Sequence, residues 1–160
     1  MAEKTNETLR IVVDDGRKRI PIENMSGDEV GVFYFNPTDM GIIARFNETV
    51  STLDDIVEPL QNIDINADGT TDVRNAEMMA ALQDAESRLY SACDYIFGGN
   101  MSEAFFGKIN PFSPIGGVFY FENALEQLGA FISDQFGKET QKVNKRVTKY
   151  AKKYTRGNTK

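Results

Sequence analysis

The sequence predicts an α+β fold: a small N-terminal antiparallel sheet of about three strands, then a mostly α-helical bundle of three main helices with a basic C-terminal helix. Short β-branched and aromatic segments separated by turn residues occupy positions 9–35, which is typical of antiparallel strands. From position 36 onward, apolar residues recur at spacings of three and four, which is typical of helices. A strongly basic composition over residues 137–160 sets the last helix apart.

Three strands are expected, over residues 9–13, 17–22 and 29–35. The first, LRIVV, is rich in β-branched residues and is followed by the turn residues DDG. The second, RKRIPI, contains Pro21, which has no N–H to donate, so this strand should lie at a sheet edge. The third, EVGVFYF, alternates enough to bury one face.

The first helix is expected to begin at NPTD, residues 36–39. Asn36 suits the N-cap, Pro37 suits the first helical position, and Asp39 would face the positive end of the helix dipole. Pro59 should end or kink this helix. Its buried face should combine Ile42 or Ile43 with Phe46, Val50, Leu53 and Val57.

The second helix should run from about Asn75 to Phe97 and end at Gly98–Gly99. After a short helical turn at MSEAFFG and a loop over residues 108–117, a third helix should begin near Gly117. We expect residues 1–136 to form a single α+β domain and residues 137–160 a basic helical extension. The apolar faces are Met78, Leu82, Ala85, Leu89, Cys93 and Ile96 on the second helix, and Val118, Phe121, Leu125, Leu128, Ile132 and Phe136 on the third.

Composition and length favour one globular domain of 160 residues, with 41% hydrophobic and 26% charged residues. No apolar run approaches the roughly 18 residues that a membrane span needs, and the N-terminus MAEKTNETLR lacks the apolar core of a signal peptide. The single cysteine, Cys93, cannot form an internal disulfide, which favours a reducing, cytoplasmic compartment. We therefore predict a cytoplasmic protein without a membrane segment.

The absence of histidine removes the commonest general base and the commonest transition-metal ligand. Ser-His-Asp and Cys-His systems cannot be built, and the chain has no glycine-rich phosphate loop. We therefore expect no enzyme, no catalytic residue and no cofactor.

The segment DINADGTTDVRN, Asp64 to Asn75, raises calcium as an alternative. It begins like an EF-hand loop, but its twelfth position is Asn75, where a bidentate glutamate is required. A turn followed by a helix cap explains the same residues, so calcium is the less favoured interpretation. Its candidate ligands would be Asp64, Asn66, Asp68 and Thr70.

The basic C-terminal segment carries nine Lys or Arg between Gly137 and Lys160 but only one acid, Glu139, so its net charge is +8. Because the whole chain is −6, the remainder carries −14, which would repel nucleic acid and makes that partner unfavoured. A solvated helix face and a docking surface for a protein remain open. The basic patch is Lys142, Lys145, Arg146, Lys149, Lys152 and Lys153, and the apolar stripe beside it is Val143, Val147, Tyr150 and Tyr154.

A second candidate partner surface lies in the glycine- and proline-rich segment after the second helix, where Phe105, Phe106, Ile109 and Phe112 gather. These residues either form an exposed apolar surface or fill the core. Because large apolar side chains are mostly buried, the core is the favoured alternative.

Three segments, FYFNPTDMGIIARF, NPFSPIGG followed by FYFENALEQL, and KRVTKYAKKYT, resemble a small phage and prophage family of Gram-positive hosts. The similarity extends from about Leu9 to Thr155, and its members are placed among the tail assembly chaperones of long-tailed phages. The resemblance implies a non-enzymatic protein of the host cytoplasm that keeps the tape measure protein soluble and helps tail-tube protein assemble around it. A structural tail or head-tail protein and a nucleic-acid-binding accessory protein acting through the basic C-terminal helix are the alternative functions. Self-association into a homo-oligomer stays open as a further partner expectation.

Overall fold

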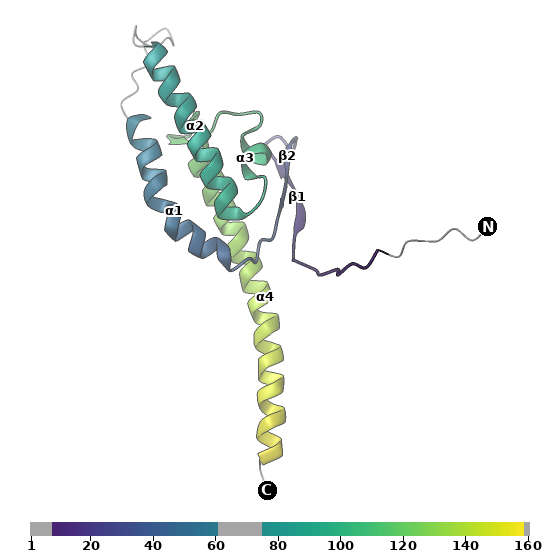
Figure 1. The fold of residues 1–160 in the computed structure, drawn as a ribbon. Coiled ribbons are helices and arrows are strands. Elements are labelled where there is room, and N and C mark those ends of the chain that lie inside the picture. The colour runs from purple at the N-terminus through teal and green to yellow at the C-terminus, as the bar shows by residue number, and fades with distance from the viewer. Residues whose placement is uncertain (1–7, 61–74, 159–160) are drawn as a thin grey trace, which may run out of the picture.

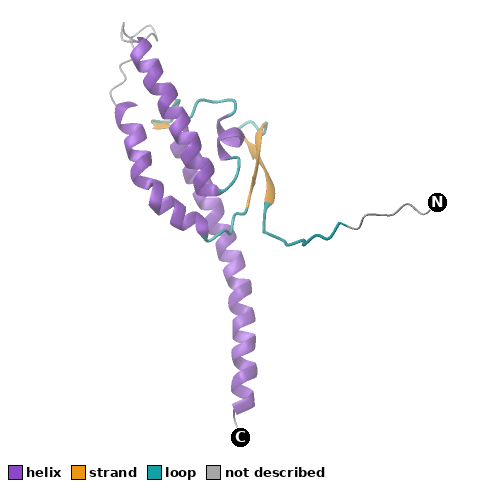
Figure 2. Cartoon of the chain, in the orientation of Figure 1, coloured by secondary structure: helices purple, strands orange, loops and turns teal. Residues whose placement is uncertain are grey.

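The computed structural model describes residues 8–60 and 75–158, with side chains described for 8–60 and 76–146. It confirms the α+β class: a small antiparallel sheet lies beside a mostly helical region (Figures 1 and 2). In chain order the elements are β1 (Lys18–Glu23), β2 (Glu29–Phe35), α1 (Gly41–Val57), the 3-10 helix η1 (Glu58–Leu60), α2 (Asn75–Phe97), α3 (Met101–Phe106), β3 (Pro114–Ile115), β4 (Val118–Phe119) and α4 (Tyr120–Asn158).

The N-terminal sheet has two strands and not about three, because the first predicted strand, residues 9–13, does not form. β1 and β2 pair in antiparallel register, with Ile20 opposite Phe33 and Pro21 opposite Val32. Residues 9–13 are extended but form no strand within the described part of the chain. High β-propensity makes a strand only where a neighbouring strand offers hydrogen bonds and a buried face, and this segment leads away from the sheet (Figure 1).

Helix α1 begins at Gly41, five residues after the expected N-cap at Asn36. The Asn36 side chain is used differently: its Oδ1 accepts from the Thr38 N–H at 2.9 Å, and its Nδ2 donates to the Asp15 carbonyl at 2.9 Å. This turn delays the helix start. The helix ends at Val57, just before Pro59, as expected.

The buried face of α1 also differs from the prediction. The helix buries Leu53 as expected, but Phe46 and Val50 lie on the outside and Val57 is half-buried. The face is rotated because Thr49, whose hydroxyl donates to the Arg45 carbonyl at 2.6 Å, can be buried without an unpaired group. The residues of α1 that face the core are Ile42, Thr49, Leu53 and Ile56.

Helix α2 confirms its predicted bounds, and Gly98, at φ +64°, ends it. Ala85, Leu89, Cys93 and Ile96 of its predicted stripe are buried. The loop predicted over residues 108–117 contains the strand β3, which pairs with β4 in a short hairpin. The two-residue turn of this hairpin is Gly116–Gly117. Both glycines have positive φ, as such hairpin turns require.

The expected third helix and the basic C-terminal helix are one continuous element, α4, which passes through Gly137 without a break. Its first half buries Phe121, Leu128 and Ile132. From residue 137 to residue 146 every side chain is exposed, and this half projects from the rest of the molecule (Figure 1).

One hydrophobic core joins the sheet to all four α-helices. The side chains that fill it come from the inner face of β2 and the facing sides of the helices. Its most fully buried large side chains are Phe33, Phe35, Ile56, Leu89, Ile96 and Met101.

Candidate protein-binding surfaces

The aromatic segment after α2 belongs to the core. Phe105, Phe106 and Phe112 are all less than 9% exposed, and Ile109 is half-buried. Phe105 packs edge-on against Phe33, with ring centroids 5.5 Å apart. These three phenylalanines therefore fill the core, and we do not retain the segment as an exposed partner surface in its own right.

The basic end of α4 is exposed as far as its side chains are described. Lys138 pairs with Asp134 at 3.0 Å and Lys142 with Glu139 at 3.2 Å, which are surface pairs of small energetic value. Val143 is exposed between Lys142 and the pair Lys145 and Arg146. The rest of the predicted patch and stripe, Val147, Lys149, Tyr150, Lys152, Lys153 and Tyr154, lies outside the described side chains.

The calcium alternative falls on Asp64, Asn66, Asp68 and Thr70, which lie outside the described residues. Among the residues that are described, no three Asp, Glu or Cys side chains gather where they could share a metal ion. The Cys93 thiol is buried in α2, and this burial, with the nearby Asp94 charge, raises its pKa to about 12. A thiol with such a pKa is a poor nucleophile at neutral pH.

The outer face of α1 is an apolar surface that the sequence pattern did not indicate as exposed. Ile43, Phe46 and Val50 are between 38% and 51% exposed and follow one another at spacings of three and four. They therefore form one stripe along the outside of the helix. We call these three residues the outer α1 stripe.

A cavity of about 510 Å³ continues the outer α1 stripe toward α4. Val50 and Val57 contribute its apolar wall on α1, and Phe121 contributes from α4. Three carboxylates, Asp54, Glu58 and Glu122, line the same cavity. An apolar surface bordered by acids matches a ligand that is apolar in its centre and basic at its edge.

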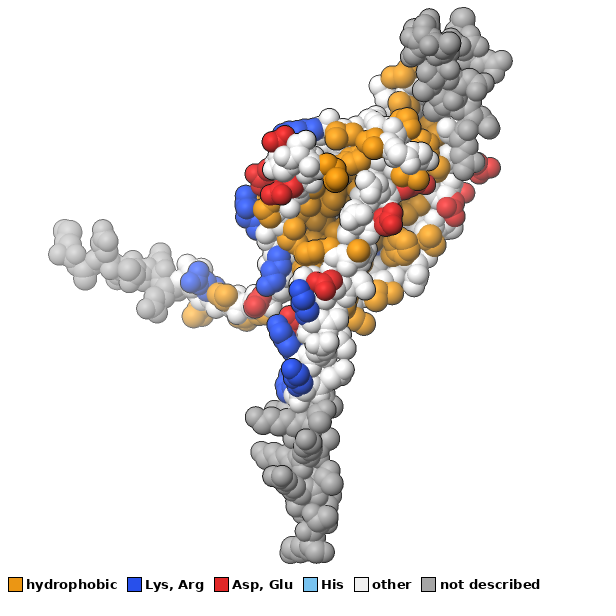
Figure 3. All heavy atoms as spheres, turned by 180° about the vertical axis from the view of Figure 1, so that it is seen from behind, with side chains coloured by type: hydrophobic (Ala, Val, Ile, Leu, Met, Phe, Trp, Pro, Cys, Tyr) orange, Lys and Arg blue, Asp and Glu red, His pale blue; other side chains and the backbone are white. Residues whose placement is uncertain are grey.

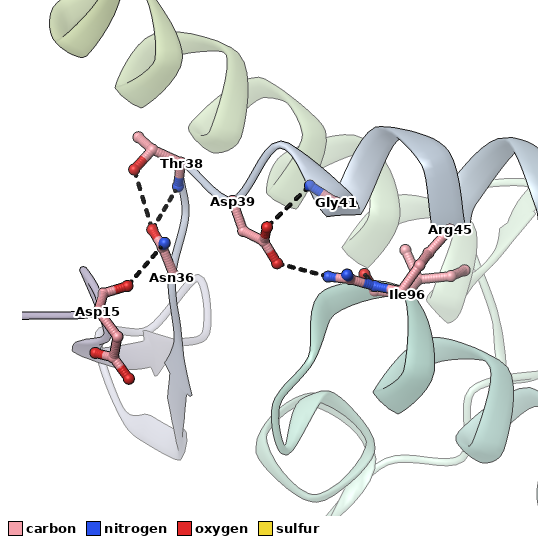
Figure 4. Close-up of polar contacts among 7 residues, drawn as sticks. All are labelled: Asp15, Asn36, Thr38, Asp39, Gly41, Arg45 and Ile96. Carbon is pink, nitrogen blue, oxygen red and sulfur yellow. Dashed lines mark hydrogen bonds and ion pairs between the residues drawn. The ribbon is translucent and has the colours of Figure 1, made fainter. Parts of the chain in front are cut away.

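A polar network fixes the start of α1 (Figure 4). Arg45 Nη2 donates to Asp39 Oδ2 at 2.7 Å, and Arg45 Nε donates to the Ile96 carbonyl at 2.9 Å. Asp39 Oδ1 in turn accepts the Gly41 N–H at 2.9 Å. These bonds join α1 to the end of α2 and thereby set the direction in which the outer α1 stripe faces.

The hydrogen bond from Arg45, together with that from the Gly41 N–H, lowers the pKa of Asp39 below its ordinary value of 3.8. A lowered pKa in the folded state adds stability that is present above the unfolded pKa and is lost as the pH falls through the folded pKa. We expect Arg45→Met to lower the free energy of unfolding by about 1–2 kcal/mol at neutral pH. That figure allows for solvent screening, because the Asp39 side chain is 39% exposed.

Urea unfolding of wild type and Arg45→Met between neutral pH and pH 3 tests this linkage. The difference between the two proteins should shrink below about pH 4, leaving the contribution of the bond to the Ile96 carbonyl. Arg88→Met, an exposed position on α2, is the matched control and should show no such pH dependence. A difference that stays constant across this range would contradict the role of the Asp39 carboxylate.

A second apolar hollow lies between the sheet and α4, with a volume of about 380 Å³. Its floor is formed by Phe33 and Phe105, and its sides by Ile20 and Ile22 of β1 and Leu128 of α4. From behind, hydrophobic side chains are seen gathered in the middle of the molecule, with charged side chains at the border (Figure 3). We call this hollow the β1–α4 groove.

The sequence of α1 contains a pattern that could have indicated the outer α1 stripe. Two overlapping apolar series run through α1, one with Ile42 and one with Ile43, and only one can face the core. The series with Ile42 faces the core, and it includes the buried Thr49. Because threonine is not counted as apolar, the pattern alone does not identify this series as the buried one.

Models of protein families, curated proteins and solved structures were all compared with the chain, and no match was found in any of the three comparisons. Across residues 8–60 and 75–158, no helix combines the length and the apolar character that crossing a membrane requires.

Proposed function

We propose that this chain is a phage tail assembly chaperone, a non-enzymatic factor that binds the tape measure protein and keeps it soluble in the cytoplasm of the bacterial host. The observation that carries a protein-binding role is the outer α1 stripe, where Ile43, Phe46 and Val50 expose apolar side chains beside an open cavity. Grouped apolar side chains at a surface are typical of docking sites for other proteins.

An amphipathic helix is the client segment that suits this surface. Such a helix presents apolar side chains at positions i, i+3, i+4 and i+7 and lays them into an apolar groove. The spacing of the outer α1 stripe, with Val57 and Phe121 farther along the cavity, offers a complementary row. Lysines or arginines at the edges of the client helix would meet Asp54, Glu58 and Glu122. A long helical protein such as a tape measure protein would supply many such segments.

The basic half of α4 suits a second partner. Lys145 and Arg146 are exposed on a helix that projects from the body, so they can reach an acidic protein surface without bringing the acidic body close. We propose tail-tube protein as this partner. A structural tail protein would instead remain in purified particles, from which a chaperone is absent.

The test is recovery of the tape measure protein with the tagged chain from nuclease-treated, phage-producing cells. We expect Phe46→Glu with Val50→Glu to reduce that recovery at least tenfold, because two charges would be buried against an apolar client. Quantitative mass spectrometry of the captured proteins measures the loss.

The matched control is Met25→Glu, which changes a fully exposed residue in the turn between β1 and β2 and should leave recovery unchanged. Circular dichroism must show the same helix content for both variants. Undiminished recovery of the tape measure protein with the double variant would remove the outer α1 stripe from the proposal, and no recovery with wild type would overturn the chaperone function itself.

A further inference from the structure

The segment 9–13 belongs to no helix or strand and exposes its apolar side chains. Leu9, Ile11, Val12 and Val13 are between 75% and 96% exposed. Removing these four apolar side chains from water would contribute a favourable free energy of about 25 cal/mol per Å² of apolar surface buried. Burial of these side chains against a partner would therefore be favourable.

The turn that follows directs this segment away from its own sheet. Asp14 Oδ1 accepts the Gly16 N–H at 2.9 Å, and Asp15 Oδ1 accepts the Arg17 N–H at 3.0 Å. The Asn36 side chain holds the Asp15 carbonyl at 2.9 Å, as Figure 4 shows. Gly16 has a φ of +77°, which a residue with a side chain rarely adopts. In this conformation residues 9–13 lead away from β1 of the same chain (Figure 1).

The sheet has one open edge that could receive a strand. The outer edge of β2 is closed by Asn100, whose Oδ1 accepts the Tyr34 N–H at 2.8 Å and whose Nδ2 donates to the Val32 carbonyl at 2.9 Å. Helix α3 packs against the same strand. β1, in contrast, has β2 as its only strand neighbour within the described residues. An unpaired strand edge is a template for a further strand. Pro21 lies in the middle of this edge and has no N–H, so an added strand would bond there to the Pro21 carbonyl alone.

The open edge borders the β1–α4 groove, which is lined by Ile20 and Ile22. Alternate residues of a strand point to the same side. A strand added beside β1 would therefore place every second side chain over this groove.

We propose that residues 9–13 of one copy of the chain add as an antiparallel strand to the β1 edge of a second copy. The register that matches both faces places Ile11 opposite Ile22 and Val13 opposite Ile20, with these side chains in the β1–α4 groove. On the outer side it places Arg10 opposite Glu23, and Asp14 opposite Arg19. The parallel orientation would instead bring Asp14 and Asp15 toward Glu23, so charge selects the antiparallel one.

The connection through residues 14–17 acts as the hinge of a strand exchange. An open hinge converts a strand pair that could form within one chain into the same pair between two chains. This self-association goes beyond the proposed chaperone function and uses a different face from the outer α1 stripe, so either proposal can fail alone.

Light scattering on the purified full-length chain provides the first test. Wild type should have a mass of at least two chains of 17.9 kDa each, and Ile11→Asp should reduce it to that of one chain. Met25→Asp, an equally exposed apolar position outside the proposed contact, should keep the wild-type mass. A wild type that has the mass of one chain up to millimolar concentration, or an assembly that Ile11→Asp leaves intact, would overturn the proposal.

Disulfide trapping tests the register and separates exchange from folding back. Arg10→Cys and Glu23→Cys, prepared as two separate variants and mixed, should form a 10–23 disulfide between copies on mild oxidation, since opposed residues in antiparallel strands have Cβ atoms about 5 Å apart. The native Cys93 is buried and should not interfere. Arg10→Cys mixed with Asp28→Cys is the control. Equal yields from the two mixtures, or a double Arg10→Cys/Glu23→Cys variant that closes only within one chain, would overturn the proposal.

Discussion

Phe33→Ala is expected to lower the free energy of unfolding by about 3–5 kcal/mol, because the alanine leaves a cavity that the surroundings only partly fill. Phe33 is 0% exposed and joins three parts of the core. Its ring stacks on Phe35 with centroids 4.0 Å apart, and it meets Phe97 and Phe105 edge-on at 6.5 and 5.5 Å. Domains of this kind have a total stability of about 5–15 kcal/mol, so the loss is a large fraction of the whole.

Thermal unfolding followed by circular dichroism measures this effect, and a Tm lower by about 10 °C or more corresponds to it for a chain of this size. The neighbouring Tyr34 points outward and is 41% exposed. Tyr34→Ala should therefore cost less than about 1 kcal/mol. Similar losses for the two variants would mean that β2 does not connect the sheet to the helices through Phe33.

The elements that the sequence predicted well are those in which local signals and tertiary packing agree. EVGVFYF alternates and forms β2 over the predicted residues, and α2 runs from Asn75 to Phe97 as predicted. In α2 one apolar stripe ends at Gly98, where only a residue that tolerates positive φ fits. In both elements the apolar face that the local pattern predicts is also the face that packs in the core.

Predictions failed where several partners compete for one group. Asn36 has the chemistry of an N-cap, but its side chain bonds to Thr38 and to Asp15, which is distant in sequence. The segment 9–13 has the composition of a strand, but a strand also needs a neighbour, and composition carries no information about one. The outer α1 stripe fails for another reason: its spacing fits a buried face equally well, so periodicity predicts burial for residues that the structure leaves exposed.

The candidate surfaces also divide into those that residue type predicts and those that depend on tertiary neighbours. The burial of Phe105, Phe106 and Phe112 could be favoured from residue type alone, since large apolar side chains are usually inside. The β1–α4 groove could not be found in this way, because it combines Ile20 and Ile22 with α4 residues about a hundred positions later. The groove exists only because α3 and α4 approach the sheet closely. One glycine in β2, Gly31, controls the distance between α3 and the sheet.

Gly31→Ala is expected to destabilise the protein by about 3 kcal/mol, because the added methyl group has no space. It would lie 2.9 Å from the Ala104 Cα and closer still to the Ala104 carbonyl oxygen. These are backbone atoms of α3, so a rotamer change cannot relieve the clash. To accept the methyl group, α3 must move away from β2.

A second glycine, Gly129 in α4, separates this steric effect from the general effect of replacing glycine. A methyl group there would meet nothing within 4 Å, so Gly129→Ala should stabilise the protein by about 0.5–1 kcal/mol through helix propensity. Urea unfolding of both variants measures the two changes in the free energy of unfolding, which should have opposite signs. If Gly31→Ala were neutral, α3 would not be held against β2, and the closed edge at Asn100, on which the choice of β1 as the open edge depends, would be lost as well.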